Sequence, residues 1–268
     1  MTLTPARDAA ARVPDPVPSR SPSSSPSPGL LRRAVCEFGL TALLLLAVVS
    51  GVRWLFAPDG YGGGGVAFAL LGAGVGVLLG ALMLSAPGRW SGGHLNPAVT
   101  VALWRLGVFP GREVVPYVVA QLGGSVAGTW AAGLVWGPVV AGPPVSYAVV
   151  RPGPGWGEGA VVAAEAGVPA GSALLLAGLL ARPVGRRLLP YAVGLVTALV
   201  IAVLGPLSGG SANPARQFGP ALLSGEVGRL WVYVAGPVLG AVAGAGLCRG
   251  AGALGVRITR PPVRPRQP

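Results

Sequence analysis

Two short polar segments stand out in an otherwise apolar chain, because they repeat one another. Residues 91–98 read SGGHLNPA and residues 208–215 read SGGSANPA, so six of the eight positions agree. Asparagine is among the best helix N-caps, since its side-chain oxygen accepts a hydrogen bond from a backbone N–H of the first turn. Proline suits the first helical position. Asn96 with Pro97, and Asn213 with Pro214, are therefore predicted to begin two helices in the same way.

These two helix starts define a particular chemistry. With its oxygen occupied by the cap, each asparagine keeps an amide NH2 that is free to donate to another molecule. Each helix N-terminus also carries roughly half a positive charge. A passage between Asn96 and Asn213 would therefore accept lone pairs from neutral molecules and repel cations, including hydronium.

Arg216 follows Asn213 by three residues, in the first turn of the second predicted helix, where a cation opposes the helix dipole. Val99 holds the corresponding position in the first copy. If this helix begins in the middle of a membrane, as the composition discussed below indicates, the arginine costs from about 3 to well above 10 kcal/mol there. Such a costly position calls for a functional role. A fork of donors at a polar constriction fits, since it would hydrogen-bond a passing solute and repel cations. The alternative is a positively charged flank whose side chain reaches the surface.

Glu37 and Glu165 are the acidic residues well inside long apolar stretches. An unpaired buried carboxylate is costly, and the backbone N–H groups of the two Ser-Gly-Gly turns need partners if they lie within the membrane. The symmetric placement of the two glutamates favours support of these turns. The alternative is a proton or sodium relay, which intramembrane acids often indicate.

The elements that position these residues follow from composition. The chain has 268 residues, of which 52% are hydrophobic and only 10% charged, against about 25% charged in soluble domains. The net charge of +12 comes from 20 arginines with no lysine, placed mainly in the tails and between apolar runs. Nucleic-acid binding would need them clustered on one face. The composition predicts a membrane protein.

Six apolar stretches are long enough to cross a bilayer, which takes about 20 residues; they are 34–56, 65–86, 114–136, 160–180, 188–207 and 230–247. Two more, 96–106 and 213–223, are too short to cross. The predicted fold is therefore an all-α membrane protein with six transmembrane helices and two re-entrant half-helices. Because each half holds three spans, the second half is inverted relative to the first, an arrangement that points to a pathway near the midplane.

The chain is divided into a Pro/Ser-rich, disordered tail at 1–29, a transmembrane domain at 30–250 and a basic tail at 251–268. The two halves of the domain are about 30–137 and 158–250. Cytoplasmic flanks collect arginine, and counting them predicts that both termini are cytoplasmic. The protein is expected in the plasma membrane, in contact with the lipid bilayer.

No metal or cofactor is expected, since His94 has no neighbouring cysteine or acidic cluster. Cys36 and Cys248 are interpreted as packing residues. The sequence favours an enzyme least of all, because no nucleophile, base and orienting group occur together. Small residues spaced three or four apart in 114–136 and 230–247 are expected to allow close helix packing.

These features together resemble the aquaporin and glycerol-facilitator family, the major intrinsic proteins. The resemblance covers about residues 37–247 and rests on both Asn-Pro-Ala boxes, Arg216, the Glu-Phe at 37–38, the Ala-Gln at 120–121 and the Gly-Pro at 236–237. It implies a bundle of six tilted helices and two half-helices, a pore in each subunit and a homotetramer. Asn96 and Asn213 become the central donors, and Arg216 part of an outer selectivity filter.

The remaining filter positions are assigned by this resemblance. Gly210 would contribute its backbone, and spacing places the other two positions at Ile201 and Gly76, provided that neither span carries an insertion. Strict water channels have an aromatic residue and a histidine there, so this filter is expected to be wider and less polar. The segment 205–216 is similar to the nodulin-like branch and its bacterial relatives, which is associated with glycerol, urea and uncharged metalloid acids.

The sequence therefore predicts a passive channel for water and small neutral solutes, which needs no cofactor and no nucleic acid. The alternatives are a strict water channel and an ion-coupled secondary transporter that uses Glu37 or Glu165. A structural membrane protein with a closed pore is a further alternative, which the lack of a large external domain disfavours.

Overall fold

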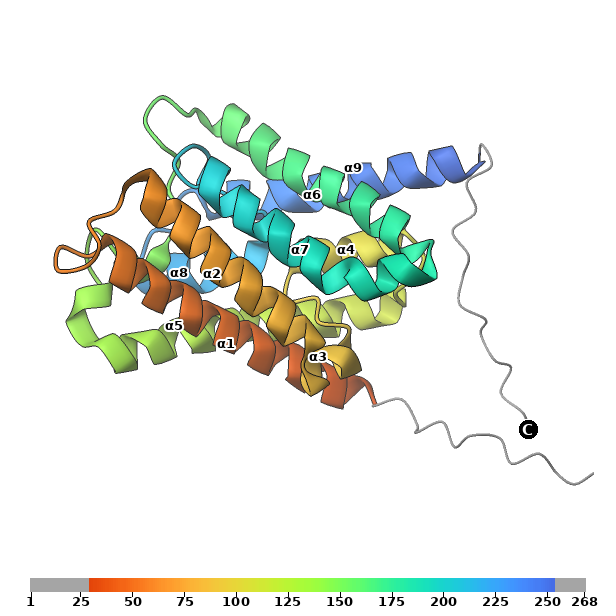
Figure 1. Cartoon of the computed structure of the whole chain (residues 1–268), viewed down its shortest axis with the longest axis horizontal. Helices are drawn as coiled ribbons and strands as arrows, with labels where there is room; N and C mark the ends of the chain where they lie inside the picture. The colour runs from red at the N-terminus through yellow and green to blue at the C-terminus, as the bar shows by residue number, and fades with distance from the viewer. Residues whose placement is uncertain (1–28, 254–268) are drawn as a thin grey trace, which may run out of the picture.

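The computed structural model describes residues 29–253, and over that range the chain is helical with no strand. The tails expected at 1–29 and 251–268 lie almost entirely outside the described residues. The helices, shown in Figure 1, are α1 (Leu30–Phe56), α2 (Gly64–Leu84), α3 (Ala86–Ser91), α4 (Pro97–Arg105), α5 (Val114–Trp136), α6 (Glu158–Leu180), α7 (Pro183–Leu204), α8 (Pro214–Ser224) and α9 (Leu230–Ala253), with short 3-10 turns η1 (Gly111–Glu113), η2 (Gly137–Val140) and η3 (Ser146–Ala148).

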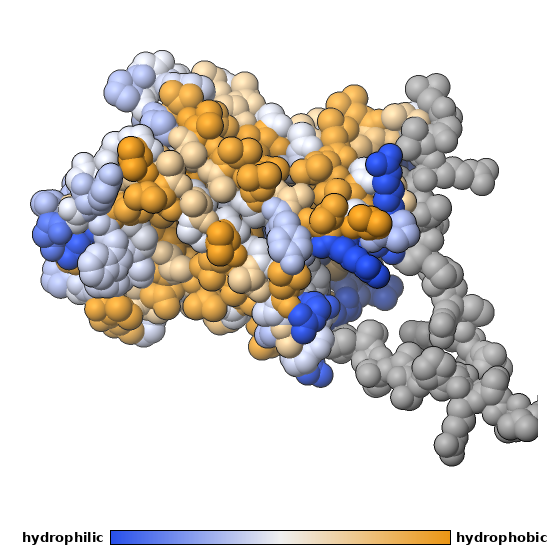
Figure 2. All heavy atoms as spheres, in the orientation of Figure 1, coloured by the Kyte–Doolittle hydropathy of each residue, from blue (hydrophilic) through white to orange (hydrophobic). Residues whose placement is uncertain are grey.

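Six of these helices are long and apolar enough to cross a membrane, and they are the six that the sequence predicts. The half-helices α4 and α8 also begin where they are expected, directly after Asn96 and Asn213. Apolar side chains cover most of the face seen in Figure 2, and hydrophilic residues gather toward its two ends. This is the surface that a bilayer requires.

Several helix ends differ by a few residues from the predicted ones; α1 begins four residues earlier and α9 ends six residues later. Helix α7 begins five residues before the expected start, because Pro183 occupies the first turn, where its missing N–H is no loss. The short helix α3 was not expected at all. Its N-cap is Ser85, whose hydroxyl accepts a hydrogen bond from the backbone N–H of Gly88. Helix α3 separates the end of α2 from the first Ser-Gly-Gly turn.

The helices pair as an inverted repeat would. Helix α1 packs along α5 in the first half, α6 packs along α9 in the second, and α2 and α7 pack across the boundary between the halves. Glycines make the first two pairings close. A Cβ added at Gly128 would overlap the backbone of Ala42 in α1, and one at Gly240 would overlap the backbone of Ala166 in α6. Such contacts stabilise helix association where the hydrophobic effect does not act.

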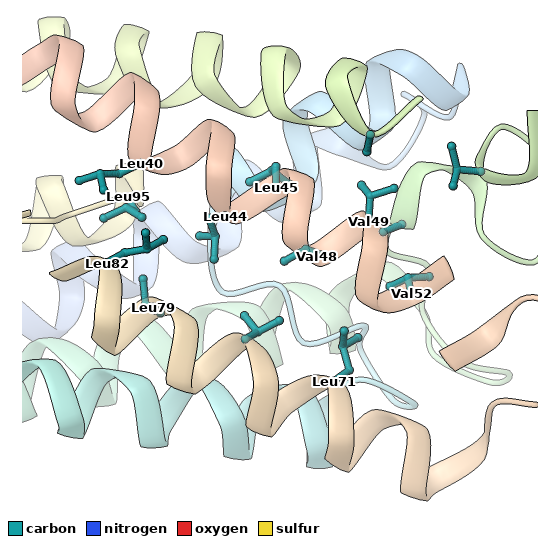
Figure 3. Close-up of a cluster of buried hydrophobic side chains, with 14 of the residues drawn as sticks. Leu40, Leu44, Leu45, Val48, Val49, Val52, Leu71, Leu79, Leu82 and Leu95 are labelled. Carbon is teal, nitrogen blue, oxygen red and sulfur yellow. The ribbon is translucent and has the colours of Figure 1, made fainter. Parts of the chain in front are cut away.

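The main apolar cluster lies between α1 and α2 and reaches the first re-entrant turn. In Figure 3 the buried side chains of α1 face those of α2, with Leu95 of the turn beside them. This cluster fixes the position of the first box relative to both helices. Its labelled members are Leu40, Leu44, Leu45, Val48, Val49, Val52, Leu71, Leu79, Leu82 and Leu95.

Candidate functional site: a central cavity between two half-helices

The two boxes have nearly the same backbone. In each, the asparagine is the N-cap and accepts a hydrogen bond from the second residue after it, at 2.8 Å for Asn96 and 3.0 Å for Asn213. The residues just before them, Leu95 and Ala212, both have φ of 48°, a left-handed conformation that is uncommon outside glycine. Equal strain at equivalent positions shows that one local structure was used twice.

The asparagine side chains join the two boxes across the centre of the molecule. The Asn96 amide donates to the Ala212 carbonyl at 3.1 Å, and the Asn213 amide donates to the Leu95 carbonyl at 3.0 Å. These two crossed bonds place the N-termini of α4 and α8 opposite each other. Each NH2 has two hydrogens, so one hydrogen of each amide is used by the other box and one is left.

Each re-entrant turn is held by a buried glutamate. Glu37 accepts hydrogen bonds from the backbone N–H groups of His94 (2.9 Å) and Leu95 (2.8 Å). Glu165 accepts them from Ser211 (3.1 Å) and Ala212 (2.6 Å). Each carboxylate has a third donor from a side chain, because the Gln121 amide donates to Glu37 and the Ser208 hydroxyl donates to Glu165.

A matched pair of tyrosines supports the same turns. The Tyr117 hydroxyl donates to the Ser91 carbonyl and the Tyr233 hydroxyl donates to the Ser208 carbonyl, both at 2.7 Å. Both tyrosines are fully buried. These tyrosines were not among the predicted site residues, although they occur at corresponding places in α5 and α9, where the repeat of the two halves is the signal for them.

A cavity of about 140 Å³ runs past both asparagines. Along α2 its lining extends from Phe68 to Leu79, which corresponds to about 16 Å of helix. The walls are mostly aliphatic side chains of α1, α2, α6 and α7. The polar side chains that line the cavity are His94, Asn96, Ser172, Thr197, Ser211, Asn213 and Arg216.

Arg216 lines this cavity and is also bonded to the segment between α5 and α6. Its guanidinium donates to the Ala148 carbonyl at 2.6 Å. The next residue, Gln217, is buried and bonds both backbone groups of Val150, accepting from its N–H at 2.8 Å and donating to its C=O at 3.0 Å. Gln217 was not among the predicted site residues, and its partners are main-chain atoms of Val150, which leave no signal in residue type.

The filter positions expected from spacing lie at two different depths. Ile201 and Gly210 line the cavity, whereas Gly76 packs against α7, where an added Cβ would overlap the Gly194 carbonyl oxygen. Gly194 and Ile201 are seven residues apart on α7, or about 10 Å. Gly76 therefore cannot face the cavity beside Ile201, and this expectation is corrected.

Spacing along the sequence does not show which face of α2 meets the cavity, and Gly76 lies on the face that packs against Gly194 and Ala198 of α7. Phe68 and Leu71 are the α2 side chains that line the cavity nearest the level of Ile201. Gly205, one turn after Ile201, lies against the Phe68 ring, and Gly72 lies against the backbone of Ala198.

His94 lines the cavity on the side of the first box. Its Nδ1 lies 3.1 Å from the Thr100 hydroxyl, and its ring packs against the rings of Phe109 and Tyr117, with centroids 4.8 and 5.1 Å away. Over the described range, no group of three or more His, Cys, Asp or Glu side chains could hold a metal ion. Cys36 and Cys248 are free thiols.

Comparison with known proteins identifies this architecture. The profile of the family described as "Major intrinsic protein" matches residues 24–247 of the chain. The chain belongs to the major intrinsic protein family. This family comprises channel proteins rather than enzymes, so the chain is a membrane channel.

Named relatives come from archaea and plants. The chain is 42% identical to "Probable aquaporin AqpM" of Archaeoglobus fulgidus over 192 residues, which cover 68% of this chain and 73% of the relative. It is 33% identical to "Probable aquaporin NIP5-1" of Arabidopsis thaliana over 242 residues, which cover 89% of this chain and 74% of the relative. The resemblance inferred from the boxes is thus confirmed.

A solved structure has the same fold. The structure of the aquaglyceroporin from Plasmodium falciparum superimposes with a TM-score of 0.70 over 84% of this chain and 100% of that one. The two sequences are 22% identical. This likeness supports the all-helical major intrinsic protein architecture.

Proposed function

We propose that this major intrinsic protein is a passive channel for water and small uncharged solutes such as glycerol, urea or uncharged metalloid acids, and that it excludes ions and protons. The observation that carries the proposal is that one and the same cavity passes both asparagine amides and Arg216. The names of the archaeal and plant relatives, all aquaporins, support passage of water.

The centre of the cavity favours neutral molecules with lone pairs. Each asparagine keeps one amide hydrogen after its crossed bond, and two helix N-termini point at the same place. The helix dipoles together contribute about one positive charge there. A molecule such as water or a polyol accepts these hydrogen bonds, and a cation is repelled.

The constriction proposed around Arg216 has polar groups on one side and apolar side chains on the other. Arg216 and the backbone of Gly210 are its polar members, and Ile201 with Leu71 or Phe68 form an aliphatic and aromatic wall. A polyol has a polar and an apolar side, and such a lining fits both. A leucine or phenylalanine stands where a glycine was expected, so the opening is narrower than the sequence suggested. Its walls are nevertheless less polar than those of a strict water channel with a histidine at this level.

The alternatives differ in what they require of the same residues. A strict water channel would need the wall at Leu71 and Ile201 to exclude glycerol. An ion-coupled transporter would need Glu37 or Glu165 to exchange a proton or sodium ion. Each carboxylate, however, already accepts three hydrogen bonds: two from backbone N–H groups of its turn and one from a side chain, Gln121 for Glu37 and Ser208 for Glu165.

We also propose a homotetramer in the plasma membrane, with both termini in the cytoplasm. The support for the orientation is an imbalance of charge between the two ends of the bundle. Among the described residues, the end that carries the start of α1 has nine arginines and one acidic residue, Glu113; those arginines are Arg32, Arg33, Arg89, Arg105, Arg112, Arg182, Arg186, Arg187 and Arg249. Cytoplasmic flanks collect such residues.

Uptake of labelled solutes into proteoliposomes tests this function. Glycerol and urea should equilibrate faster than in protein-free vesicles and stop at equal concentrations inside and outside, with or without an ionophore. Accumulation above equilibrium, or collapse of uptake when an ionophore is added, would favour the transporter. Fast water flux without glycerol or urea uptake would establish the strict water channel.

A further inference from the structure

The segment before α6 passes over the second box and is tied to α8 and its flanks at several points. The Ala148 carbonyl accepts from Arg216, Val150 makes two bonds with Gln217, and Arg151 forms an ion pair with Glu226. A further tie is the Gly153 N–H, which donates to the Leu207 carbonyl at 2.7 Å. Residues 148–153 are called the strap below.

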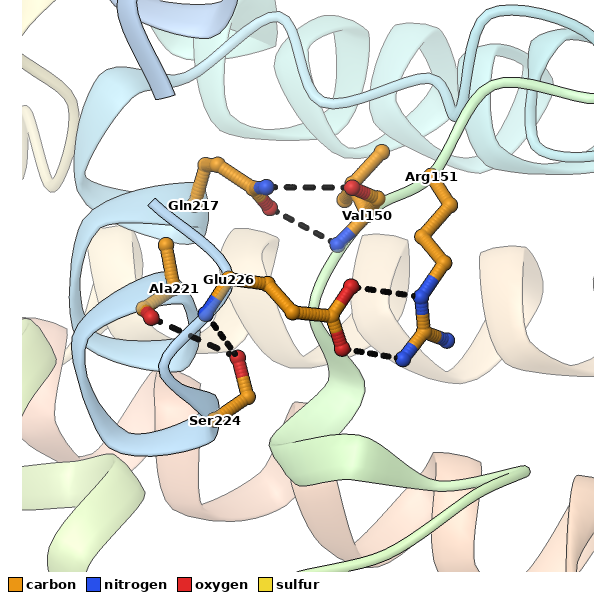
Figure 4. Close-up of polar contacts among 6 residues, drawn as sticks. All are labelled: Val150, Arg151, Gln217, Ala221, Ser224 and Glu226. Atoms are coloured by element: carbon orange, nitrogen blue, oxygen red, sulfur yellow. Dashed lines mark hydrogen bonds and ion pairs between the residues drawn. The ribbon is translucent and has the colours of Figure 1, made fainter. Parts of the chain in front are cut away.

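Figure 4 shows the middle of this arrangement. The Gln217 amide makes two parallel hydrogen bonds with the backbone of Val150, and Arg151 and Glu226 form a bidentate ion pair. Gln217 lies in the first turn of α8, and Glu226 follows the end of α8, where its backbone N–H reaches the Ser224 hydroxyl at 3.4 Å. The strap is therefore held near both ends of the half-helix that carries Arg216.

The strap needs such ties because the backbone that leads into it is strained. Ser146, Tyr147 and Ala148 have φ of 40°, 51° and 61°, three consecutive left-handed residues without a glycine. Each such residue costs of order 1–3 kcal/mol, and the conformation persists only where the surroundings enforce it. The carbonyl that Arg216 bonds belongs to the last of these three residues. Loss of the ties would let Ala148 relax and would release the guanidinium.

We infer that Gln217, aided by the Arg151–Glu226 pair, is a specificity-determining positioning residue, which clamps the strap so that the Ala148 carbonyl holds the Arg216 guanidinium at the cavity. The inference rests on the proposed function, since it assigns Arg216 to the filter. None of the three residues, Gln217, Arg151 and Glu226, lines the cavity. They act through the strap on Arg216, which does.

The two parts of the clamp differ in strength. Gln217 is fully buried and makes two backbone hydrogen bonds at 2.8 and 3.0 Å. The Arg151 and Glu226 side chains are 44% and 42% exposed, and exposed ion pairs contribute little even when their geometry is good. Gln217 is therefore the principal positioning residue, and the ion pair is the auxiliary one.

The test uses the full-length channel in proteoliposomes and compares Gln217→Met and Glu226→Gln with the native chain. Methionine keeps the length of the side chain and removes both bonds. The ratio of glycerol to water permeability should change by about fivefold in Gln217→Met, with increased proton leak, and by less in Glu226→Gln. The matched control is Asp59→Asn, which breaks the Arg53–Asp59 pair away from the strap and should leave the ratio unchanged.

A further variant and a comparison of the two permeabilities distinguish a positioning role from a purely structural one. The charge-swapped double variant Arg151→Glu with Glu226→Arg should return the ratio to within about twofold of native, since it restores the pair. If Gln217→Met lowers water and glycerol permeability by one common factor at equal protein content, the role is only structural and the inference is overturned.

Amide hydrogen exchange separates this inference from the proposed function. The Val150 N–H should exchange faster in Gln217→Met, while the amides of α4 remain protected. If the native chain conducts neither water nor glycerol, the proposed function fails, and exchange at Val150 then decides the clamp by itself. Faster exchange would support the clamp, and unchanged exchange would overturn it.

Discussion

The two halves of the chain build the same turn and cover it differently. The first box lies against a compact aromatic group, in which His94 packs on Phe109 and Tyr117. The second box lies under a long strap tied by polar contacts and carries Arg216. The turn itself is therefore the repeated structural unit. The two halves differ in the residues that pack on the turn, and only the second half places an arginine, Arg216, beside it.

The residues after the two boxes show this difference most clearly. Val99 and Thr100 follow the first box, and Thr100 bonds inward to Asn96, His94 and Gln121. Arg216 and Gln217 follow the second, and both bond outward to the strap. In the first half the bonds of Thr100 therefore stay within the same half. In the second half Arg216 and Gln217 bond to a segment distant in sequence, the strap, which holds Arg216 beside the cavity.

The largest effect should come from removing that asymmetry. Arg216→Val gives the second box the residue of the first, and it should raise proton leak relative to water flux by about tenfold or more, because the cation that repels hydronium is gone. A pH-sensitive dye inside vesicles measures the leak. The matched control, Val99→Ala in the first half, should leave the leak at the native level, and an equal rise in both variants would contradict the assigned role of Arg216.

The glutamate that holds each re-entrant turn is common to both halves, so matching substitutions of the two glutamates should have equal effects. Glu37→Gln and Glu165→Gln should each lower the free energy of unfolding by about 2–3 kcal/mol. In the native chain both carboxylate oxygens accept from backbone N–H groups, and in each variant one of these N–H groups would face an NH2 group instead. Thermal unfolding in detergent measures both. Glu158→Gln, at the start of α6, is the control. Losses that differ by more than about 1 kcal/mol would show that the two turns are not equivalent in energy.

The corrected filter position gives a test that separates packing from selectivity. Gly76→Ala should lower stability by about 1–2 kcal/mol, because the new Cβ meets the Gly194 carbonyl, and should leave the glycerol-to-water ratio unchanged. Leu71→Ala, at the cavity wall, should instead raise that ratio. A changed ratio in Gly76→Ala with none in Leu71→Ala would restore the position assigned by spacing.

The smallest effect concerns the strap at low pH. The hydrogen bond from Arg151 lowers the pKa of Glu226 below its ordinary value of 4.5. The charged pair therefore stabilises the fold above about pH 4.5 and loses this contribution as the pH falls through the lowered value. Glu226→Gln should reduce the dependence of the melting temperature on pH below 4.5. An identical profile in both proteins would show that the pair adds no stability.

Much of this architecture can be predicted from the sequence, because local rules decide it. Asn-Pro specifies a helix start wherever it stands, which is why α4 and α8 begin at the expected residues. Twenty apolar residues in a row leave few alternatives to a spanning helix, and the bounds of α5 agree with the prediction to the residue.

The rest depends on contacts between distant residues. Spacing alone does not show which face of a helix meets the cavity, and Gly76 lies on the face of α2 that packs against α7. The bond from Arg216 to Ala148 joins residues 68 positions apart through a backbone carbonyl, and a backbone acceptor leaves no signal in residue type. Gln217 is similar, since its partner Val150 contributes only main-chain atoms.

The central claim is that neutral polar molecules cross this protein through the cavity between Asn96 and Asn213. Stopped-flow light scattering from proteoliposomes tests it most directly, by recording osmotic shrinkage and subsequent reswelling in glycerol. Both phases should be faster than in protein-free vesicles, and both should slow in the double variant Asn96→Leu with Asn213→Leu at equal protein content. Rates equal to those of protein-free vesicles for water and glycerol alike would contradict it.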